Sequence, residues 1–325
     1  MHRRSVLAAL ATLPLAWLVA PERDARAQAP RRIKSLSRNA LGTTLVLGLR
    51  HAPFAGLNYD DDTVIVFVPE HYRYRDEEGV AVLVHFHGHN STAERALVAH
   101  ELREQLVDSR QNAVLVVPQL AVMAADSSCG HLDSPGGLSR LLTEAIMVAA
   151  HDGGVTLDES GFPPNAELGP VCISAHSGGY HAAACSLRDG GVEVRETYLF
   201  DALYGESDAF RDWVIARRGA PASNRHKLVS YYGAGAPTES VNRALKGELE
   251  RAGVLVAEET REGELSRHEL SHAAAVFVRT TVSHSYVTWE TNAVRDVLYA
   301  STLPRHLPAT WFSNRTGARP IERRR

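Results

Sequence analysis

The sequence predicts an α/β protein with a mainly parallel central sheet and helices on both faces. Runs of apolar, β-branched residues alternate with stretches of helical periodicity along most of the chain. The strand-like runs are apolar throughout, whereas a strand with one face in water alternates polar and apolar residues. Both faces of these strands must therefore be covered, and the intervening helices can cover them.

Each predicted strand is short and rich in Val, Ile, Leu or aromatic residues. The predicted strands are residues 63–69 (TVIVFVP), 80–87 (VAVLVHFH), 113–118 (AVLVVP), 171–175 (VCISA), 194–200 (VRETYLF) and 228–233 (LVSYYG). A further strand-like run, AAVFVRTT, occupies residues 274–281. A chain of this kind needs a crossover between parallel neighbours, which predicts a helix in most of the gaps.

The helices are predicted from apolar spacing of three and four residues between the strands. They cover residues 92–109, 137–150, 178–187, 207–217, 238–252 and 287–299. Ser91 and Thr92 supply a capping residue before the first of them, and the third is rich in alanine. Two stretches, 119–136 and 152–169, have Gly, Pro, Ser and Asp instead, and we expect them to be excursions that shape a cleft.

Composition is that of an ordinary globular protein. Of 325 residues, 44% are hydrophobic and 22% charged, and 24 Gly with 15 Pro are too few for a low-complexity or collagen-like chain. The formal net charge of −3 provides no field to hold a nucleic-acid backbone or an anionic membrane. A single domain over residues 28–302 is the simplest organisation.

The first 27 residues resemble a signal peptide. His2-Arg3-Arg4 precedes an uncharged run at 5–20, and Ala25-Arg26-Ala27 provides a small-x-small cleavage pattern. The paired arginines favour a twin-arginine leader, with the general secretory route as the alternative. We expect an exported, periplasmic or secreted protein with no membrane span after cleavage, and a loose basic tail at 303–325.

The most informative segment contains Ser177. The strand at 171–175 leads into Ala175-His176-Ser177-Gly178-Gly179, and an alanine-rich helix follows. A serine becomes a nucleophile when a base removes its proton and when it stands clear of the backbone. A sharp strand-to-helix turn provides that position and requires small residues two before and two after the serine, which are Ala175 and Gly179. Ser177 is therefore the candidate nucleophile.

The oxyanion formed by such a nucleophile needs two backbone N–H groups. One is predicted at Gly178, where the helix begins and its dipole favours negative charge. The second is predicted in the loop after the strand at 80–87, at Gly88 or His89, because glycine lets the backbone approach closely.

A general base and an orienting acid are predicted downstream of the nucleophile. His284 follows the strand-like run at 274–281, so it is placed at the end of a strand. Asp201 ends the strand at 194–200 and is the preferred acid. Glu239 follows the next strand and is the alternative acid.

The sequence resembles the α/β-hydrolase superfamily over residues 60–300. The resemblance lies in HGHN after an early strand, AHSGG at the turn, and the chain order Ser177, Asp201, His284. The opening TVIVFVPEHY…VAVLVHFHGH is similar to secreted esterases and polyester depolymerases of that superfamily. The resemblance implies a sheet of about eight strands and hydrolysis of small or polymeric esters without a cofactor. Amides and lactones stay open as substrates. Two departures are Ala175 in place of Gly and an acid after strand six instead of seven.

Two other patterns suggest metal chemistry. His268-Glu269-Leu270-Ser271-His272 satisfies H-E-x-x-H, the pattern of a zinc peptidase helix, with Glu290 available as a third ligand. His85, His87 and His89 alternate at a strand end, as in some metal-dependent hydrolases, although they could equally line the cleft floor or the oxyanion loop. Arg267 beside the first pattern, and the absence of a suitably spaced Asp after the second, make both the weaker hypotheses.

A catalytically silent binding protein on a hydrolase scaffold is the hypothesis outside catalysis. The three cysteines leave their own state open. Cys172 lies in an apolar strand and Cys185 in a helix, where a free thiol behaves as a small hydrophobe. Cys129, in a loop, is the one placed for redox chemistry. The sequence does not indicate an oligomeric state.

Overall fold

The computed structural model describes residues 32–151, 162–163, 165–261 and 263–306, which lie in a compact unit that starts at Arg32. The predicted signal peptide, most of the 152–169 excursion and residues 307–325 lie outside the described residues. No helix within the described ranges is long and apolar enough to cross a membrane.

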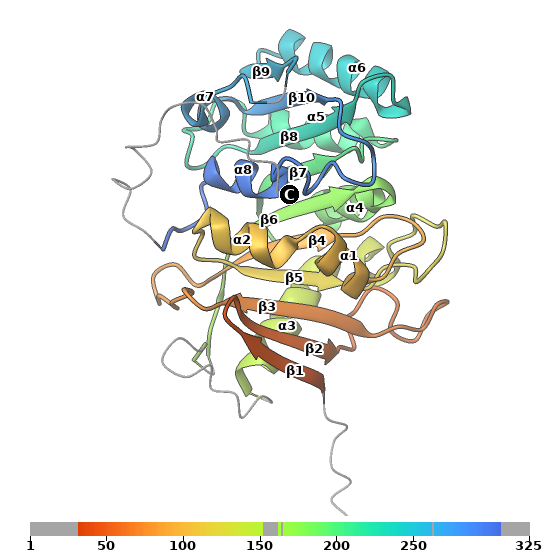
Figure 1. Cartoon of the computed structure of the whole chain (residues 1–325), viewed down its shortest axis with the longest axis vertical. Coiled ribbons are helices and arrows are strands. Elements are labelled where there is room, and N and C mark those ends of the chain that lie inside the picture. The colour runs from red at the N-terminus through yellow and green to blue at the C-terminus, as the bar shows by residue number, and fades with distance from the viewer. Residues whose placement is uncertain (1–31, 152–161, 164, 262, 307–325) are drawn as a thin grey trace, which may run out of the picture. The chain divides into compact units, whose positions relative to one another are not determined.

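The described residues form a ten-stranded sheet, and Figure 1 shows its strands one above another from β1 to β9. Its spatial order is β1-β2-β3-β5-β4-β6-β7-β8-β10-β9. The strands are β1 Ile33–Asn39, β2 Gly42–Gly48, β3 Thr63–Pro69, β4 Val80–Phe86, β5 Val114–Pro118, β6 Leu168–His176, β7 Val194–Phe200, β8 Lys227–Gly233, β9 Val256–Glu259 and β10 Ala275–Thr280. The predicted α/β class with a mainly parallel sheet is confirmed.

Pairing changes from antiparallel to parallel across the sheet. β1, β2, β3 and β5 pair antiparallel in that order, whereas every pair from β5 through β4 to β9 is parallel. The sheet has two strands more than the expected eight. They lie at its edges, β1 on one side and β9 on the other. β1 lies at an edge and is mostly exposed, so its sequence lacks the apolar run that identifies the inner strands.

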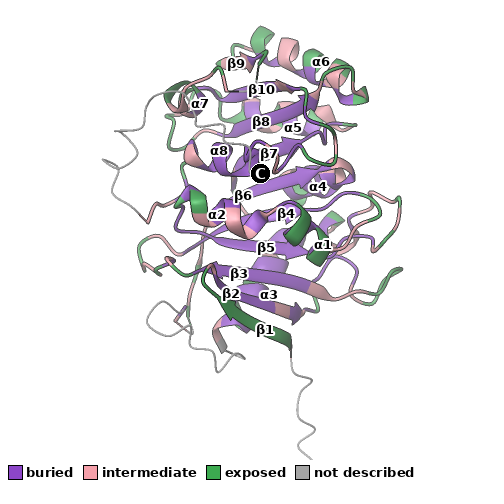
Figure 2. Ribbon diagram, in the orientation of Figure 1, coloured by how far each residue is buried: buried purple, intermediate pink, exposed green. Residues whose placement is uncertain are grey.

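Eight α-helices occur among the described residues and cover both faces of the sheet. They are α1 Ala93–Ala99, α2 Leu102–Ser109, α3 Gly137–His151, α4 Tyr180–Asp189, α5 Ser207–Ala216, α6 Pro237–Arg251, α7 Arg267–His272 and α8 Ala293–Tyr299. Apolar residues of α3 to α6 pack into one core and those of α1, α2, α7 and α8 into another. The inner strands between these cores are mostly buried, as Figure 2 shows, whereas the edge strand β1 is exposed.

Two predicted helices are shorter in the structure. The helix expected at 92–109 is interrupted because Glu101 takes a left-handed conformation, with φ of 47°. The helix expected at 287–299 begins only at Ala293, after Asn292, which is also left-handed. The residues that precede it form turns, and this is the segment that carries His284.

The first residues of the predicted loose tail, 303–306, are described, and Leu303 does not fit that prediction. That side chain is 3% exposed and packs into a core, and Arg305 forms a β-bridge with Gln111. The predicted start of the tail, at residue 303, is too early. It rests on the lack of apolar periodicity in this segment, and a single apolar residue that packs into the core, such as Leu303, creates no periodicity.

The parallel strands end on one edge of the sheet and bring four predicted site segments to it. His176 at the end of β6 is in register with Phe200 at the end of β7. Ser177 and Asp201 therefore follow neighbouring strands at the same level. His284 follows β10, and Gly88 follows β4, which is the other neighbour of β6. Binding sites of α/β proteins form at such carboxyl ends.

Candidate active site

Ser177 occupies a sharp turn between β6 and α4. Its φ is 53°, in the left-handed region that residues with a side chain rarely adopt. A short 3-10 turn, Ser177–Gly179, leads into α4. A Cβ on Gly179 would lie 2.5 Å from the carbonyl oxygen of Phe86, so this position must be glycine. The strand, strained serine and helix form the nucleophile elbow that the sequence indicates.

Ser177, His284 and Asp201 are joined by two hydrogen bonds. The Ser177 hydroxyl donates to Nε2 of His284 over 2.9 Å. Nδ1 of His284 donates to Oδ2 of Asp201 over 2.7 Å. His284 stands 39% exposed at the surface of the site, while the Asp201 side chain is only 5% exposed. The structure thus brings together the three residues whose types suit a nucleophile, a base and an orienting acid.

The surroundings of Asp201 keep its carboxylate charged. Burial alone would raise the pKa of this carboxyl, but hydrogen bonds from His284, Thr238 and the backbone of Gly233 outweigh burial and lower it. The Thr238 hydroxyl donates to Oδ1, and the N–H of Asp201 donates to the carbonyl of Tyr231 over 2.9 Å. A charged, fixed Asp201 holds the His284 proton on Nδ1 and leaves Nε2 to accept from Ser177.

The alternative acid, Glu239, is held in other contacts. It lies in the first turn of α6, where Oε2 accepts the N–H of Gly235 over 2.6 Å. Its other oxygen pairs with Arg243 at 2.7 Å and Arg279 at 3.3 Å. The hydrogen bond from Gly235 and the guanidinium of Arg243 lower the pKa of Glu239 to about 2. Both oxygens of Glu239 are therefore used in capping and charge pairing, and it is Asp201 that contacts His284.

The predicted oxyanion loop packs directly on the serine. A Cβ on Gly88 would lie 2.7 Å from Cβ of Ser177, so only glycine permits this contact. The ring of His89 lies against Gly178, whose added Cβ would be 2.2 Å from Cδ2 of His89. Gly178 is the second residue of the 3-10 turn Ser177–Gly179, and the first N–H groups of a helical turn have no acceptor within the helix. Gly88 thus lies against Ser177, and His89 lies against Gly178, the residue that follows Ser177; their role as oxyanion donors stays a prediction.

His87 fixes the orientation of this loop. Its Nε2 accepts the N–H of Leu120 over 3.0 Å, so its proton lies on Nδ1, which donates to the carbonyl of Gly88 over 2.8 Å. Burial lowers the pKa of His87 and keeps the ring neutral. Because C=O and N–H point in opposite directions in a trans peptide, a carbonyl held by His87 turns the N–H of His89 away from His87. His87 therefore positions the loop, which agrees with the loop-lining interpretation of the H-x-H pattern.

Four imidazoles lie in a row from the sheet to the site, and two of them were not identified from the sequence. Ring centroids of His85 and His100 are 5.5 Å apart, those of His100 and His176 are 4.7 Å apart, and those of His176 and His284 are 4.8 Å apart. Nε2 of His176 donates to the carbonyl of His284 over 2.9 Å. His176 thereby anchors the segment that carries His284. Its position next to Ser177 was the available sequence signal.

The buried members of this row are neutral. Burial, with the neighbouring imidazoles, lowers the pKa of His85 to about 3. Burial likewise lowers the pKa of His176 to about 4, although its bond to the His284 carbonyl opposes the change. The pKa of His100 is also well below its usual value for the same reason. The region beneath the site therefore carries no positive charge from His85, His100 or His176.

Two tyrosines lie at the rim of the site: Tyr204, which is exposed, is beside His284, and the half-buried Tyr180 is next to Tyr204. The Tyr204 ring lies edge-on to His284, with centroids 6.3 Å apart, and faces Tyr180 at 6.3 Å. Tyr204 is 41% exposed, and Met123 on the 119–136 excursion is 57% exposed. That excursion packs against the HGHN loop, since the Asn90 N–H donates to the carbonyl of Ala124 and Ser127 bonds to His89 over 2.7 Å.

The H-E-x-x-H segment does not form a metal site with other described residues. It is the six-residue helix α7, and His268, Glu269 and His272 are exposed. The Glu269 carboxylate closes a capping box with Ser266, accepting its N–H over 2.7 Å. Within the described residues, the group of Cys, His, Asp and Glu whose ligand atoms lie within 4.8 Å of one another is Cys129, His181 and Cys185.

The sheet order, the elbow and the acid after the sixth strand counted from β2 give the α/β-hydrolase architecture that the sequence resembles. No family model and no curated protein matches the chain.

Several solved structures are similar to this chain. An S-formylglutathione hydrolase from Agrobacterium tumefaciens is 14% identical, covers 88% of this chain and all of its own, and has a TM-score of 0.47. The S-formylglutathione hydrolase of Staphylococcus aureus is 14% identical over 85% of this chain and 99% of its own, with a TM-score of 0.46. A feruloyl esterase module from Clostridium thermocellum is 10% identical over 84% and 89%, also with a TM-score of 0.46. Similarities at this level fix neither the substrate nor the site residues of this chain.

Proposed function

We propose that this chain is an exported serine hydrolase that cleaves carboxylic esters through an acyl-enzyme. The observation that carries the proposal is the continuous hydrogen-bonded path from the Ser177 hydroxyl through His284 to Asp201, at 2.9 and 2.7 Å. Export follows from the predicted signal peptide. The preference for esters follows from the resemblance of the sequence to secreted esterases.

In the first half of the reaction, Nε2 of His284 takes the proton of Ser177 while Oγ bonds to the ester carbon. The carbonyl oxygen becomes an oxyanion, which the N–H groups of Gly178 and of His89 or Gly88 stabilise. Asp201 stabilises the charged imidazole. When the carbon–oxygen bond to the alcohol breaks, His284 gives its proton to the departing oxygen, and the acyl group stays on Ser177.

In the second half, water replaces the alcohol. His284 takes a proton from water, whose oxygen bonds to the acyl carbon, and the second tetrahedral intermediate expels Oγ of Ser177. The proton returns from His284 to the serine, and a carboxylic acid leaves. No cofactor is needed for either half. The neutral His176 supports this cycle by holding the backbone of His284 in place.

We expect the best substrates to be esters with an apolar or aromatic group next to the scissile bond, because tyrosine rings lie at the rim of the site. Tyr204 and Tyr180 present ring surface beside His284, and aromatic faces bind flat apolar groups well. A panel of p-nitrophenyl esters of increasing acyl length, beside a peptide and a lactone, tests both the reaction and this preference. We expect turnover of the esters and its loss in Ser177→Ala. If Ser177→Ala turned over the esters as fast as the wild type, Ser177 would not be the nucleophile. If the wild type cleaved only the peptide, the proposed preference for esters would be refuted.

A further inference from the structure

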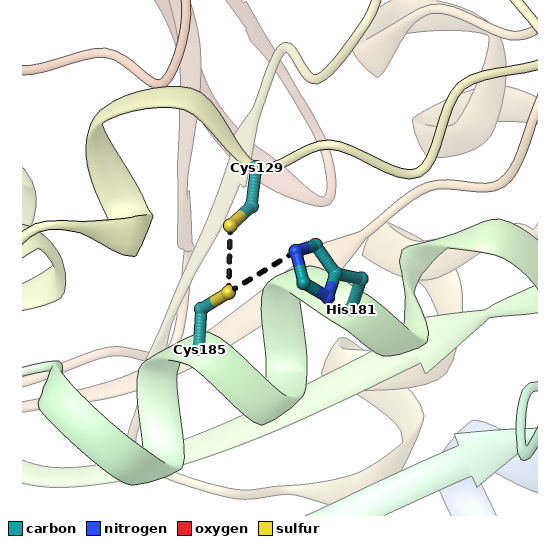
Figure 3. A group of neighbouring side chains, drawn as sticks. All are labelled: Cys129, His181 and Cys185. Atoms are coloured by element: carbon teal, nitrogen blue, oxygen red, sulfur yellow. Dashed lines mark hydrogen bonds between the residues drawn. The ribbon is translucent and has the colours of Figure 1, made fainter. Parts of the chain in front are cut away.

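Two of the three cysteines face each other beside the site. Cys129 comes from the 119–136 excursion, and Cys185 from the middle of α4. Figure 3 shows the two side chains pointing toward one another, with His181 of the same helix alongside. Both cysteines are buried, at 1% and 3% exposed, although 56 residues separate them in the chain.

The two sulfur atoms are too close for independent thiols. Sγ of Cys129 and Sγ of Cys185 lie 2.7 Å apart. Non-bonded carbon atoms attract best at about 3.5 to 4 Å, and sulfur is larger than carbon. A disulfide has its sulfurs about 2.05 Å apart. The observed separation is nearer to the bonded value, so the backbone already holds these residues where a bond can form.

His181 is placed to accept the proton that such a bond requires Cys185 to lose. Its Nε2 lies 3.6 Å from Sγ of Cys185. Its Nδ1 donates to the Glu206 carboxylate, which fixes the tautomer and leaves the Nε2 lone pair facing the sulfur. The thiol itself has no tendency to stay ionised, because contact with Cys129 and burial raise the pKa of Cys185. Catalytic cysteine pairs are easily reduced because a stable thiolate stabilises their reduced form. This pair lacks such a thiolate, so a structural disulfide fits it better than a catalytic one.

We propose that Cys129 and Cys185 form a disulfide that ties the 119–136 excursion to helix α4. The oxidant is a small-molecule or protein disulfide, the class of reagent that oxidises exported proteins. Cys129 attacks one sulfur of that disulfide, whose S–S bond breaks. The proton of the Cys129 thiol passes to the sulfur that leaves, so one thiol is released and a mixed disulfide remains. Cys185 then gives its proton to His181 and attacks Sγ of Cys129. The second thiol leaves with the proton from His181, so two thiols and one disulfide exchange without other reagents.

The link would hold two segments that frame Ser177. Ser127, two residues before Cys129, bonds to His89 over 2.7 Å, and His89 packs on Gly178. Helix α4 starts at Tyr180, directly after the elbow. The disulfide therefore clamps the loop behind the oxyanion segment to the helix that follows the nucleophile.

A metal bound by Cys129, Cys185 and His181 is the alternative occupant. Two thiolates on a tetrahedral zinc, each about 2.3 Å from the metal, lie about 3.7 Å apart. The two sulfurs are an ångström closer than that. A disulfide accounts for this distance, whereas zinc would require the pair to separate.

The test counts thiols in the full chain. The purified protein is incubated with oxidised glutathione under native conditions, freed of it, denatured and alkylated, and its mass is measured with and without prior reduction. We expect one alkylated cysteine, Cys172, without reduction and three after it, with a peptide pair linked through Cys129 and Cys185. Three alkylated cysteines before reduction, glutathione retained on either residue, or stoichiometric zinc released by a thiol reagent would overturn the disulfide.

Matched variants separate the pair from the third cysteine. Cys129→Ser should show two alkylated cysteines with or without reduction. Cys185→Ser lacks the resolving thiol, so it should keep glutathione on Cys129 and show one alkylated cysteine before reduction and two after it. Cys172→Ser should show none before reduction and two after it. Reduction should lower the thermal midpoint of the wild type and of Cys172→Ser by about 5 to 10 °C, because the link closes a long loop in the unfolded chain. An unchanged midpoint would refute the clamp. Neither readout depends on catalysis, so a failed esterase assay would leave this result standing.

Discussion

The Ser177 elbow and helix α7 both carry a short sequence pattern typical of hydrolases, and the fold uses them differently. The elbow places Ser177 at the end of a buried strand, within 2.9 Å of His284 from a segment over a hundred residues later. Helix α7 is six residues long, its two histidines are exposed, and its glutamate caps the helix. A pattern of five residues therefore indicates chemistry only when strands or helices bring it a partner from elsewhere in the chain.

The largest expected difference between the two regions is in catalysis. His284→Ala should lower kcat/KM for a p-nitrophenyl ester by about 10⁴- to 10⁶-fold, because the general base is removed. His272→Ala, which removes one of the two histidines of the zinc pattern, should leave it within about two-fold. Steady-state kinetics of both purified variants tests this, with circular dichroism as the control for folding. A large loss of kcat/KM in His272→Ala together with full activity in His284→Ala would show that α7, and not the Ser177 elbow, carries the catalysis.

The acid can be tested in the same way. Asp201→Asn should lower kcat by about 10⁴-fold, because an amide no longer holds the His284 proton on Nδ1 or stabilises the charged ring. Glu239→Gln should change kcat by about two-fold at most, since its contacts are with Gly235, Arg243 and Arg279. Comparable losses in both variants would show that Glu239 also acts on the base.

Acid should destabilise the core beneath the elbow. His176 is neutral in the folded protein, with its pKa lowered from 6.5 to about 4, so below pH 6.5 the unfolded chain binds more protons than the folded one. Stability is thus complete above pH 6.5 and falls as the pH drops toward 4. At about 1.4 kcal/mol per pKa unit, His176 accounts for about 2 to 3 kcal/mol of loss by pH 4.5.

Urea unfolding at pH 7 and pH 4.5 measures that loss. His176→Gln cannot titrate, so its free energy of unfolding should fall less between the two pH values than that of the wild type. Identical losses in the two proteins would contradict the buried neutral state of His176. The depressed pKa of Asp201 adds a further loss only at lower pH, as its carboxylate becomes protonated.

The smallest expected effect concerns positioning. His176→Phe removes the donor to the His284 carbonyl and should lower kcat about ten-fold with little change in KM. His176→Gln keeps a side-chain N–H and should restore part of that loss. A change in KM alone, or no difference between the two variants, would show that His176 acts only through packing.

The parts of this site that could be predicted from the sequence are those set by local order. Ser177 lies between an apolar run and a helix, and His284 and Asp201 follow strand-like runs, so each could be placed at a strand end from its neighbours alone. The choice between Asp201 and Glu239 could not be made in the same way, because both follow neighbouring strands. It depends on tertiary contacts, because Arg279 of the neighbouring strand β10 bonds to Glu239 while His284 bonds to Asp201.

Residues whose role depends on distant contacts were missed. His100 bonds to Thr288, 188 positions away, and His176 bonds to the carbonyl of His284, 108 positions away. Tyr204 meets His284 only through the fold. The fold errors have related origins. Apolar spacing predicts one helix over 92–109 and does not reveal the left-handed residue Glu101, and the edge strand β1 lacks the apolar run by which inner strands are predicted.

Covalent labelling of Ser177 tests the central claim most directly. A fluorophosphonate reacts with a serine only where a base has activated it, so one label per chain should be found on the peptide that contains Ser177. Ser177→Ala and His284→Ala should take up none, and His272→Ala should be labelled as fully as the wild type. A folded wild-type protein that stays unlabelled, or that carries the label on another serine, would contradict the account.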